Sequence, residues 1–261
     1  MLSAMQIDRF AREGAVTLDT PFTEDLVEAA AAELDRLCPY IPDPARGDNA
    51  FRVQRSNDYH EPALLELIQH PFLEQVARRI LGAEAVDFFA TAIAKTYPQP
   101  GEAFRFWEHV DIKYATTDLD AVPRRMVCSC LVWLTDVTPD RAPLMYRPGS
   151  HRQIAAAMDR RPEYIDNPQN FEHLPRLDYA APVPLLARKG QLTACTTSTV
   201  HGASNCTGTQ PRKVLFATFV PKGFEIRANM ASVNKRQKYV ESLRPRLRPE
   251  RRHILPDPVP A

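Results

Sequence analysis

A histidine and an aspartate two positions apart interrupt an otherwise aromatic and apolar stretch of the sequence. The segment FRFWEHVDIKY, residues 104–114, contains His109 and Asp111. If this segment is a β-strand, both side chains point to the same face, because side chains alternate along a strand. Two polar groups that are hard to bury need a partner there, and a metal ion is one. The pair therefore predicts a metal site if further ligands lie elsewhere in the chain.

A second candidate ligand is His201, which ends the alternating polar and apolar stretch of TSTVHGASN, and Arg212 opens RKVLFATFV soon afterwards. Two neutral imidazoles and one carboxylate are the ligands that many Fe(II) oxygenases use, and they leave three positions open for a keto acid and O2. A keto acid with a distal carboxylate also needs a cation, which arginine supplies as a planar fork. His109, Asp111, His201 and Arg212 together predict an iron site that binds a keto acid.

The elements that must hold these residues are helices followed by strands. Helical spacing predicts a helix in FTEDLVEAAAAELDRLC, capped by Thr23, and a pair in EPALLELIQHPFLEQVARRILG, divided at Pro71 and closed by Gly82. β-branched and aromatic segments predict strands in AVDFFATAIAK, RRMVCSCLVWLTDV, QLTACTTSTVHG and KVLFATFVP. The absence of a regular strand–helix alternation favours a mainly β fold with helical buttresses and a jelly-roll core.

We expect a single domain with three parts. Residues 1–84 are predicted to be mostly helical, residues 85–222 to form the jelly roll, and residues 223–261 to form a C-terminal helix and a basic, proline-rich tail. The polar stretch at residues 43–60 has no sustained period, so it is predicted to be a loop that acts as a lid. The tail is interpreted as solvated, with anion or partner binding as the alternative.

Composition excludes several classes of function. The chain has 261 residues and a formal net charge of +1, which gives no global field for nucleic acid or an anionic membrane. No apolar run is long enough for a signal peptide or a membrane span. The five cysteines lack Cys-x-x-Cys spacing, which favours reduced thiols and a cytoplasmic protein. We expect a monomer or homodimer.

Four segments carry a family resemblance: FWEHVD, APLMYRPGSHR, KGQLTACTTSTVHGAS and PRKVLFATFVP. In order and spacing they resemble the phytanoyl-CoA dioxygenase family of iron- and 2-oxoglutarate-dependent oxygenases, over nearly the whole chain. The resemblance implies a double-stranded β-helix, with Fe(II) on His109, Asp111 and His201 and 2-oxoglutarate on Arg212. It gives His151, in RPGSHR, a structural role.

The resemblance also suggests two further contacts for 2-oxoglutarate. Lys95, in AIAKTYP, is expected near the cosubstrate end of the pocket. The position two after the distal histidine is often a serine in the family, but in this chain it is Ala203, followed by Ser204. The cosubstrate carboxylate is therefore expected to contact Ser204 together with Arg212, or Arg212 alone.

Asp111 bears on the type of reaction. Related halogenases have a small residue there, so a carboxylate indicates hydroxylation or another oxidation of an unactivated C–H bond. The resemblance implies that 2-oxoglutarate is decarboxylated to succinate and CO2 in this reaction. The substrate is expected to be a small molecule. It carries an anionic group if Lys113, on the His109 face, or Arg52 and Arg55, in the lid-like loop, bind it; in the competing interpretation these side chains are solvated.

Two other classes of function stay open on the sequence alone. A cupin-like metal-dependent isomerase or dioxygenase would use the same ligands without 2-oxoglutarate, and Arg212 would then have no anion to bind. A non-catalytic binding module would keep the barrel without turnover, although intact metal ligands speak against it.

Overall fold

The N-terminal helices begin and end at the caps that the sequence contains. In the computed structural model, which describes residues 2–40, 51–161, 174–224 and 230–258, helix α2 (Glu24–Leu37) follows Thr23, whose Oγ1 accepts a hydrogen bond from the Leu26 amide at 3.3 Å. Helix α4 (Pro71–Leu81) ends at Gly82, which has a left-handed backbone conformation. The predicted cap at Thr23 and the predicted helix end at Gly82 are confirmed.

Six more helices and nine strands complete the described parts of the chain. The other helices are α1 (Ala4–Glu13), α3 (Pro62–Ile68), α5 (Thr116–Leu119), α6 (Ser150–Asp159), α7 (Met230–Leu243) and the 3-10 helix η4 (Pro249–Ile254). The strands are β1 (Ala15–Leu18), β2 (Arg52–Ser56), β3 (Val86–Thr96), β4 (Cys128–Trp133), β5 (Leu144–Tyr146), β6 (Val183–Leu185), β7 (Leu192–Cys195), β8 (His201–Ala203) and β9 (Arg212–Pro221).

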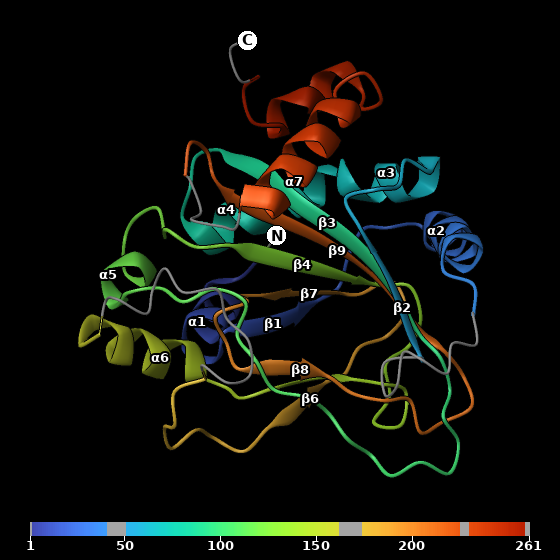
Figure 1. Cartoon of the computed structure of the whole chain (residues 1–261). Coiled ribbons are helices and arrows are strands. Elements are labelled where there is room, and N and C mark those ends of the chain that lie inside the picture. The colour runs from blue at the N-terminus through green and yellow to red at the C-terminus, as the bar shows by residue number, and fades with distance from the viewer. Residues whose placement is uncertain (1, 41–50, 162–173, 225–229, 259–261) are drawn as a thin grey trace.

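Two antiparallel sheets face each other (Figure 1). The larger sheet has the order β1-β7-β4-β9-β3-β2, and the smaller one has the order β6-β5-β8. Helices α4 and α7 pack on the outer face of the larger sheet, where the largest hydrophobic cluster lies. A second cluster, which includes Leu131, Trp133 and Val214, lies between the sheets. The predicted mainly β fold with helical buttresses and a jelly-roll core is confirmed.

The prediction of a loop at residues 43–60 is wrong for part of that range. Arg52–Ser56 is strand β2, which pairs with β3 from Arg52↔Thr96 to Ser56↔Ala92. The strand lies at the edge of the larger sheet and carries polar side chains on both faces, so the sequence lacks the alternation of polarity that marks a half-buried strand. Residues 43–50 lie outside the described residues.

Part of the C-terminal basic segment packs onto the helices. Arg251 makes a 2.7 Å ion pair with Glu74 of α4, and Arg248 makes a 3.1 Å ion pair with Glu66 of α3. Acidic side chains of the same chain therefore compensate both of these arginines. The interpretation of a solvated, partly ordered tail is wrong for the buried Arg251, whereas Arg248 is exposed.

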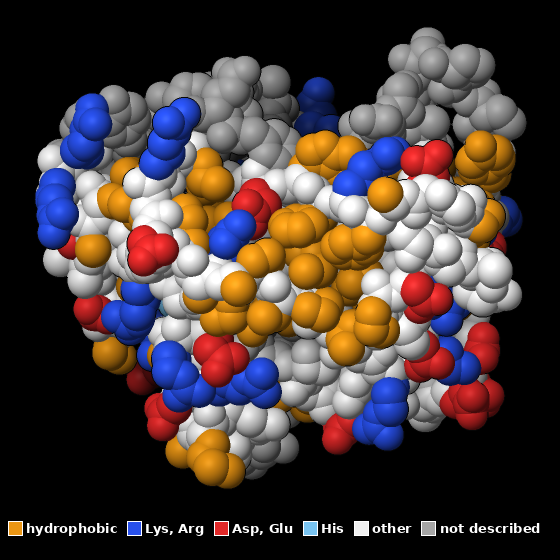
Figure 2. Space-filling model, turned by 90° about the horizontal axis from the view of Figure 1, so that it is seen from below, with side chains coloured by type: hydrophobic (Ala, Val, Ile, Leu, Met, Phe, Trp, Pro, Cys, Tyr) orange, Lys and Arg blue, Asp and Glu red, His pale blue; other side chains and the backbone are white. Residues whose placement is uncertain are grey.

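The lower face of the molecule in Figure 1 carries a broad area of hydrophobic side chains (Figure 2). Val183, in β6, and Leu186, just after it, are 37% and 44% exposed.

All five cysteines are unpaired and buried. Within the described parts of the chain, no helix combines the length and the apolar character needed to cross a membrane.

Candidate metal centre and its cavity

The three candidate ligands come together through backbone pairing of two distant segments. The His109 amide donates to the His201 carbonyl at 2.8 Å, and the His201 amide donates to the His109 carbonyl at 2.9 Å. The Asp111 amide donates to the Thr197 carbonyl at 2.9 Å. Two details differ from the expectations: residues 104–114 form isolated bridges instead of a regular strand, and His201 begins strand β8 instead of ending one.

The ligand atoms converge closely. One donor atom from each of His109, Asp111 and His201 lies within 4.8 Å of the other two. His109 Nε2 is 3.3 Å from Asp111 Oδ1, and His201 Nε2 is 3.8 Å from Asp111 Oδ2. Ligands bound about 2.1 Å from one metal ion at right angles lie about 3.0 Å apart. The three groups therefore fit one metal ion with small adjustments of the side chains.

Hydrogen bonds and charges prepare these groups for a cation. The His201 Nδ1 atom lies 2.8 Å from the Thr199 carbonyl, so this nitrogen carries the proton and Nε2 presents its lone pair. Burial lowers the pKa of His201 and favours the neutral ring. For Asp111, burial acts to raise the pKa, but the hydrogen bond from His109 and the charges of His201, His109 and Arg52 bring it below the ordinary value.

A glycine permits the close approach of the two ligand segments. A Cβ atom at Gly202 would lie 1.7 Å from the Trp107 carbonyl oxygen, so any side chain there would push the segments apart. An ion pair also holds this segment, because Arg147 donates two hydrogen bonds of 2.5 and 3.1 Å to the Glu108 carboxylate. The motif RPGSHR thus helps to hold the chain beside His109.

The ligands open into a cavity of about 410 Å³ between the two sheets. Arg212 lines the same cavity, and its side chain is almost completely buried. It donates to the Ala142 carbonyl at 2.6 Å and to Thr96 Oγ1 at 3.2 Å, whereas its buried Nε has no hydrogen-bond partner among the described residues. Burial, followed by the charge of Arg52, lowers the pKa of Arg212 to about 9. A buried cation with only neutral partners fits an anionic ligand.

Lys95 and Ser204 do not face this cavity, contrary to expectation. Lys95 lies on the other face of β3 and binds Asp35 of α2 at 2.6 Å, because the strand turns Thr96 toward Arg212 and Lys95 away from it. Ser204 is buried and donates to the Pro143 carbonyl at 2.7 Å, while Ala203 lines the cavity. Both residues have structural contacts instead of cosubstrate contacts.

This placement gives a testable expectation for Lys95→Met. Asp35 keeps Lys213 as a partner, so the loss of one partly exposed ion pair should lower the free energy of unfolding by about 1 kcal/mol. That corresponds to a drop of about 2–4 °C in Tm. The Michaelis constant for 2-oxoglutarate should not change. An increase of tenfold or more in that constant would show that Lys95 contributes to 2-oxoglutarate binding.

The three basic residues considered for the substrate are separated by the structure. Arg52 lines the cavity together with Gln54 and Ser56, which follow it at alternate positions of β2. Arg55 belongs to the opposite face of the strand and pairs with Asp58 at 3.3 Å. Lys113 is 3% exposed and is not among the residues that line the cavity, although its neighbour Ile112 is. Of the three, Arg52 alone is placed to contact a substrate.

Several residues that line the cavity were not predicted from the sequence. The walls include Ala90 and Ala92 of β3, Ser129 and Leu131 of β4, and Phe216 of β9. Each occupies one of the alternating positions of a predicted strand, so the alternation of side chains could have indicated two candidate sets of lining residues. The strand register, which the sequence does not reveal, decides which alternate set faces the cavity.

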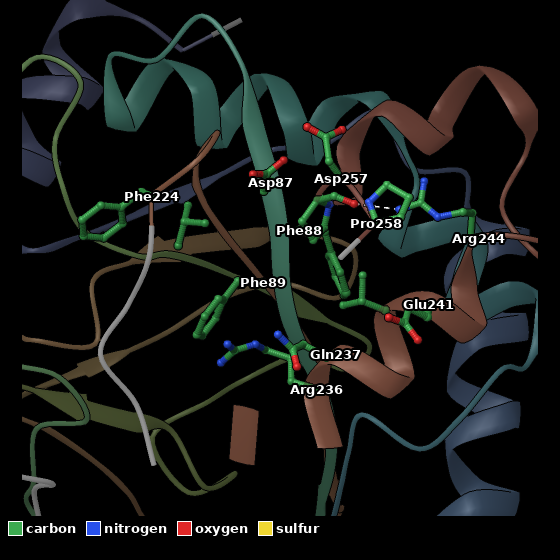
Figure 3. A pocket seen from close by; sticks show the side chains of 13 residues that line it. Asp87, Phe88, Phe89, Phe224, Arg236, Gln237, Glu241, Arg244, Asp257 and Pro258 are labelled. Atoms are coloured by element: carbon green, nitrogen blue, oxygen red, sulfur yellow. Dashed lines mark hydrogen bonds between the residues drawn. The ribbon is translucent and has the colours of Figure 1, made fainter. Parts of the chain in front are cut away.

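A second cavity of about 390 Å³ lies between α7 and the start of β3 (Figure 3). Phe89 borders both cavities, and the Arg236 guanidinium carbon lies 3.9 Å from the centre of its ring. The acidic and basic groups of this second cavity include Asp87, Glu241 and Arg244 (Figure 3), and the three-ligand cluster lies in the first cavity. The first cavity is therefore the candidate active site.

A jelly roll that brings two histidines and a carboxylate beside a buried arginine has the ligand set of the mononuclear non-haem iron oxygenases. Comparisons with known proteins agree with this class. The model of the family Phytanoyl-CoA dioxygenase (PhyH) matches residues 10–214. The ectoine dioxygenase of Bordetella parapertussis is 30% identical over 243 residues, which cover 84% of this chain and 75% of that protein. The chain belongs to the phytanoyl-CoA dioxygenase family.

Solved structures share the fold at low sequence identity. The epimerase SnoN from nogalamycin biosynthesis, in complex with Fe3+, alpha ketoglutarate and nogalamycin RO, has a TM-score of 0.61 and 17% identity, with 86% of each chain covered. EctD from S. alaskensis with bound Fe has a TM-score of 0.59 and 22% identity, with 86% of this chain and 79% of that chain covered. The protein is an iron- and 2-oxoglutarate-dependent dioxygenase of the hydroxylase type that acts on a small molecule.

Proposed function

We propose that this oxygenase holds Fe(II) on His109, Asp111 and His201, binds 2-oxoglutarate through Arg212, and hydroxylates a C–H bond of a small molecule. The observation that carries the proposal is the position of Arg212: a buried guanidinium with only neutral hydrogen-bond partners lines the cavity into which the three ligands point. The distal carboxylate of 2-oxoglutarate would supply the missing negative charge and accept a hydrogen bond from the Nε–H group.

The side chains of the protein perform binding, orientation and exclusion of water. When bound, iron and 2-oxoglutarate supply the oxidising chemistry with O2, and succinate and CO2 are released. Thr199 keeps His201 in the tautomer that presents Nε2. Leu131, Trp133 and Leu144 form apolar walls that limit the access of water to the reacting groups. Arg212 would hold the distal carboxylate of 2-oxoglutarate, which would leave the keto acid end free to bind the iron.

Asp111 supports hydroxylation over halogenation, because its carboxylate fills the coordination position that a halide would need. The relatives named ectoine dioxygenase support a small-molecule substrate. The unpaired thiols of the five cysteines support a cytoplasmic location. Membership of a dioxygenase family favours turnover with 2-oxoglutarate over the alternatives of a cupin-like isomerase or a binding module.

We expect Arg212→Lys to act mainly on the cosubstrate. Lysine keeps the charge but loses the planar fork, so two charge-assisted hydrogen bonds become one. The loss should cost about 1.5–3 kcal/mol, or roughly 10- to 150-fold in 2-oxoglutarate affinity. The measurement is the dissociation constant of 2-oxoglutarate in the absence of O2, with the iron content determined in parallel.

Arg141→Lys is the matched control, because Arg141 donates to the Pro211 carbonyl near the start of β9 and lies outside the cavity lining. This variant should bind 2-oxoglutarate as the unaltered protein does. An unchanged dissociation constant in Arg212→Lys at normal iron content would mean that another residue holds the distal carboxylate.

A further inference from the structure

Within the described parts of the chain, a second arginine of the cavity also has no acidic partner at hydrogen-bond distance. The Nη2 group of Arg52 donates to Gln54 Oε1 at 2.8 Å, and the buried Nε has no hydrogen-bond partner among the described residues. Arg55, three strand positions later and on the other face, pairs with Asp58 in the ordinary way. The contrast within one short strand shows that the cavity side leaves its arginine uncompensated.

Arg52 lies among the groups that we assign to the metal and the cosubstrate. On the edge strand it pairs with Thr96, whose Oγ1 accepts a hydrogen bond from Arg212. Asp111, His201 and Arg212 line the same cavity as Arg52. Burial lowers the pKa of Arg52, and Asp111 opposes this effect in part.

A count of charges shows what the loaded cavity lacks. An Fe(II) ion and Arg212 together bring three positive charges, and 2-oxoglutarate and Asp111 together bring three negative charges. The two histidines are neutral as ligands. The charge of Arg52 then has no counterpart among the described residues that line the cavity, and its Nε atom is buried. One further negative charge on a bound molecule other than the cosubstrate would restore the balance.

We propose that Arg52 binds a singly charged acidic group, a carboxylate, on the primary substrate. This inference rests on the proposed function, because the charge count includes Fe(II) and 2-oxoglutarate. A phosphate monoester carries more than one negative charge near neutral pH and would overcompensate Arg52. The substrate class is therefore a small organic monocarboxylic acid. Gln54 and Ser56 continue the polar wall beyond Arg52, whereas Phe89 and Ile112 supply apolar contacts. Arg52 is a specificity-determining residue.

The test measures binding of defined acids under argon to protein loaded with Fe(II) and saturating 2-oxoglutarate. The probes are acetate, butyrate and benzoate, each compared with its neutral amide by isothermal titration calorimetry. The visible absorption of the iron–keto acid complex is recorded in the same samples. The variants are Arg52→Gln and, as the matched control, Arg55→Gln, which removes the same charge from the other face of β2.

We expect at least one acid to bind the unaltered protein and Arg55→Gln more tightly than its amide does. Arg52→Gln should weaken the binding of that acid by about 10- to 100-fold. The binding of the amide and the iron–keto acid absorption should not change. Three results would overturn the inference: no acid preferred over its amide, equal acid binding in both variants, or a loss of 2-oxoglutarate affinity in Arg52→Gln as large as the loss for the acid. If the iron–keto acid absorption never forms in the unaltered protein, the proposed function itself fails.

Discussion

Asp111→Ala is expected to abolish turnover and to weaken iron binding by at least about 100-fold. Removal of groups that merely support metal ligands costs about 10- to 100-fold in other proteins, so the loss of one of three ligands should cost no less. The fold should survive, since Asp111 is exposed to the cavity and contributes only its amide to backbone pairing. The same result is expected for His109→Ala and His201→Ala.

Iron content and substrate-independent succinate release should be measured on each of these variants, with thermal unfolding as the check on the fold. Asp120→Ala and His253→Ala are suitable controls, because both side chains lie on the surface: Asp120 pairs with Arg152, and His253 contacts the Glu74 carboxylate. Full turnover at normal iron content in a triad variant would remove that residue from the metal site.

Gly202→Ala is expected to have the second-largest effect, although glycine contributes no ligand atom. The added Cβ would lie 1.7 Å from the Trp107 carbonyl oxygen, which belongs to the backbone and cannot move aside independently. The two hydrogen bonds between His109 and His201 should be strained or broken, so both imidazoles leave their positions. We expect iron affinity to fall at least about tenfold and the free energy of unfolding to fall by about 1–3 kcal/mol.

The control is Gly223→Ala, at a position where an added Cβ meets no atom within 4 Å. Its positive φ of 74° should cost about 1 kcal/mol in stability without a change in iron affinity. Comparable iron affinity in Gly202→Ala and the unaltered protein would show that the two ligand segments tolerate separation, which contradicts their close packing through Gly202.

The sequence predicted that His109 and Asp111 share one side of the chain because that property is local, and the structure places His201 beside them. The side chains of His109 and Asp111 point to the same side even though their segment forms only isolated bridges. An extended chain alternates its side chains however regular its pairing is. The cap at Thr23 and the break at Pro71 are equally local. The order of helices and strands then sufficed to predict a jelly roll.

The residues around the ligands could not be predicted in the same way, because their orientation depends on register between strands. Lys95 and Thr96 are adjacent in the sequence, yet pairing with β9 and β2 turns Thr96 toward Arg212 and Lys95 toward Asp35. Arg52 and Arg55 looked equivalent in a polar stretch, and strand β2 separates them onto opposite faces. A shift of one residue would reverse every such assignment.

Anaerobic titration of the purified protein with Fe(II) and then 2-oxoglutarate tests the metal and cosubstrate sites together. We expect one iron to bind per chain and 2-oxoglutarate to produce the weak visible absorption of an iron–keto acid complex. Arg212→Lys should need more cosubstrate to reach this absorption, and Asp111→Ala should not form it. Tight iron binding without this absorption at saturating 2-oxoglutarate would contradict the assignment of Arg212, and failure to bind iron would contradict the metal centre itself.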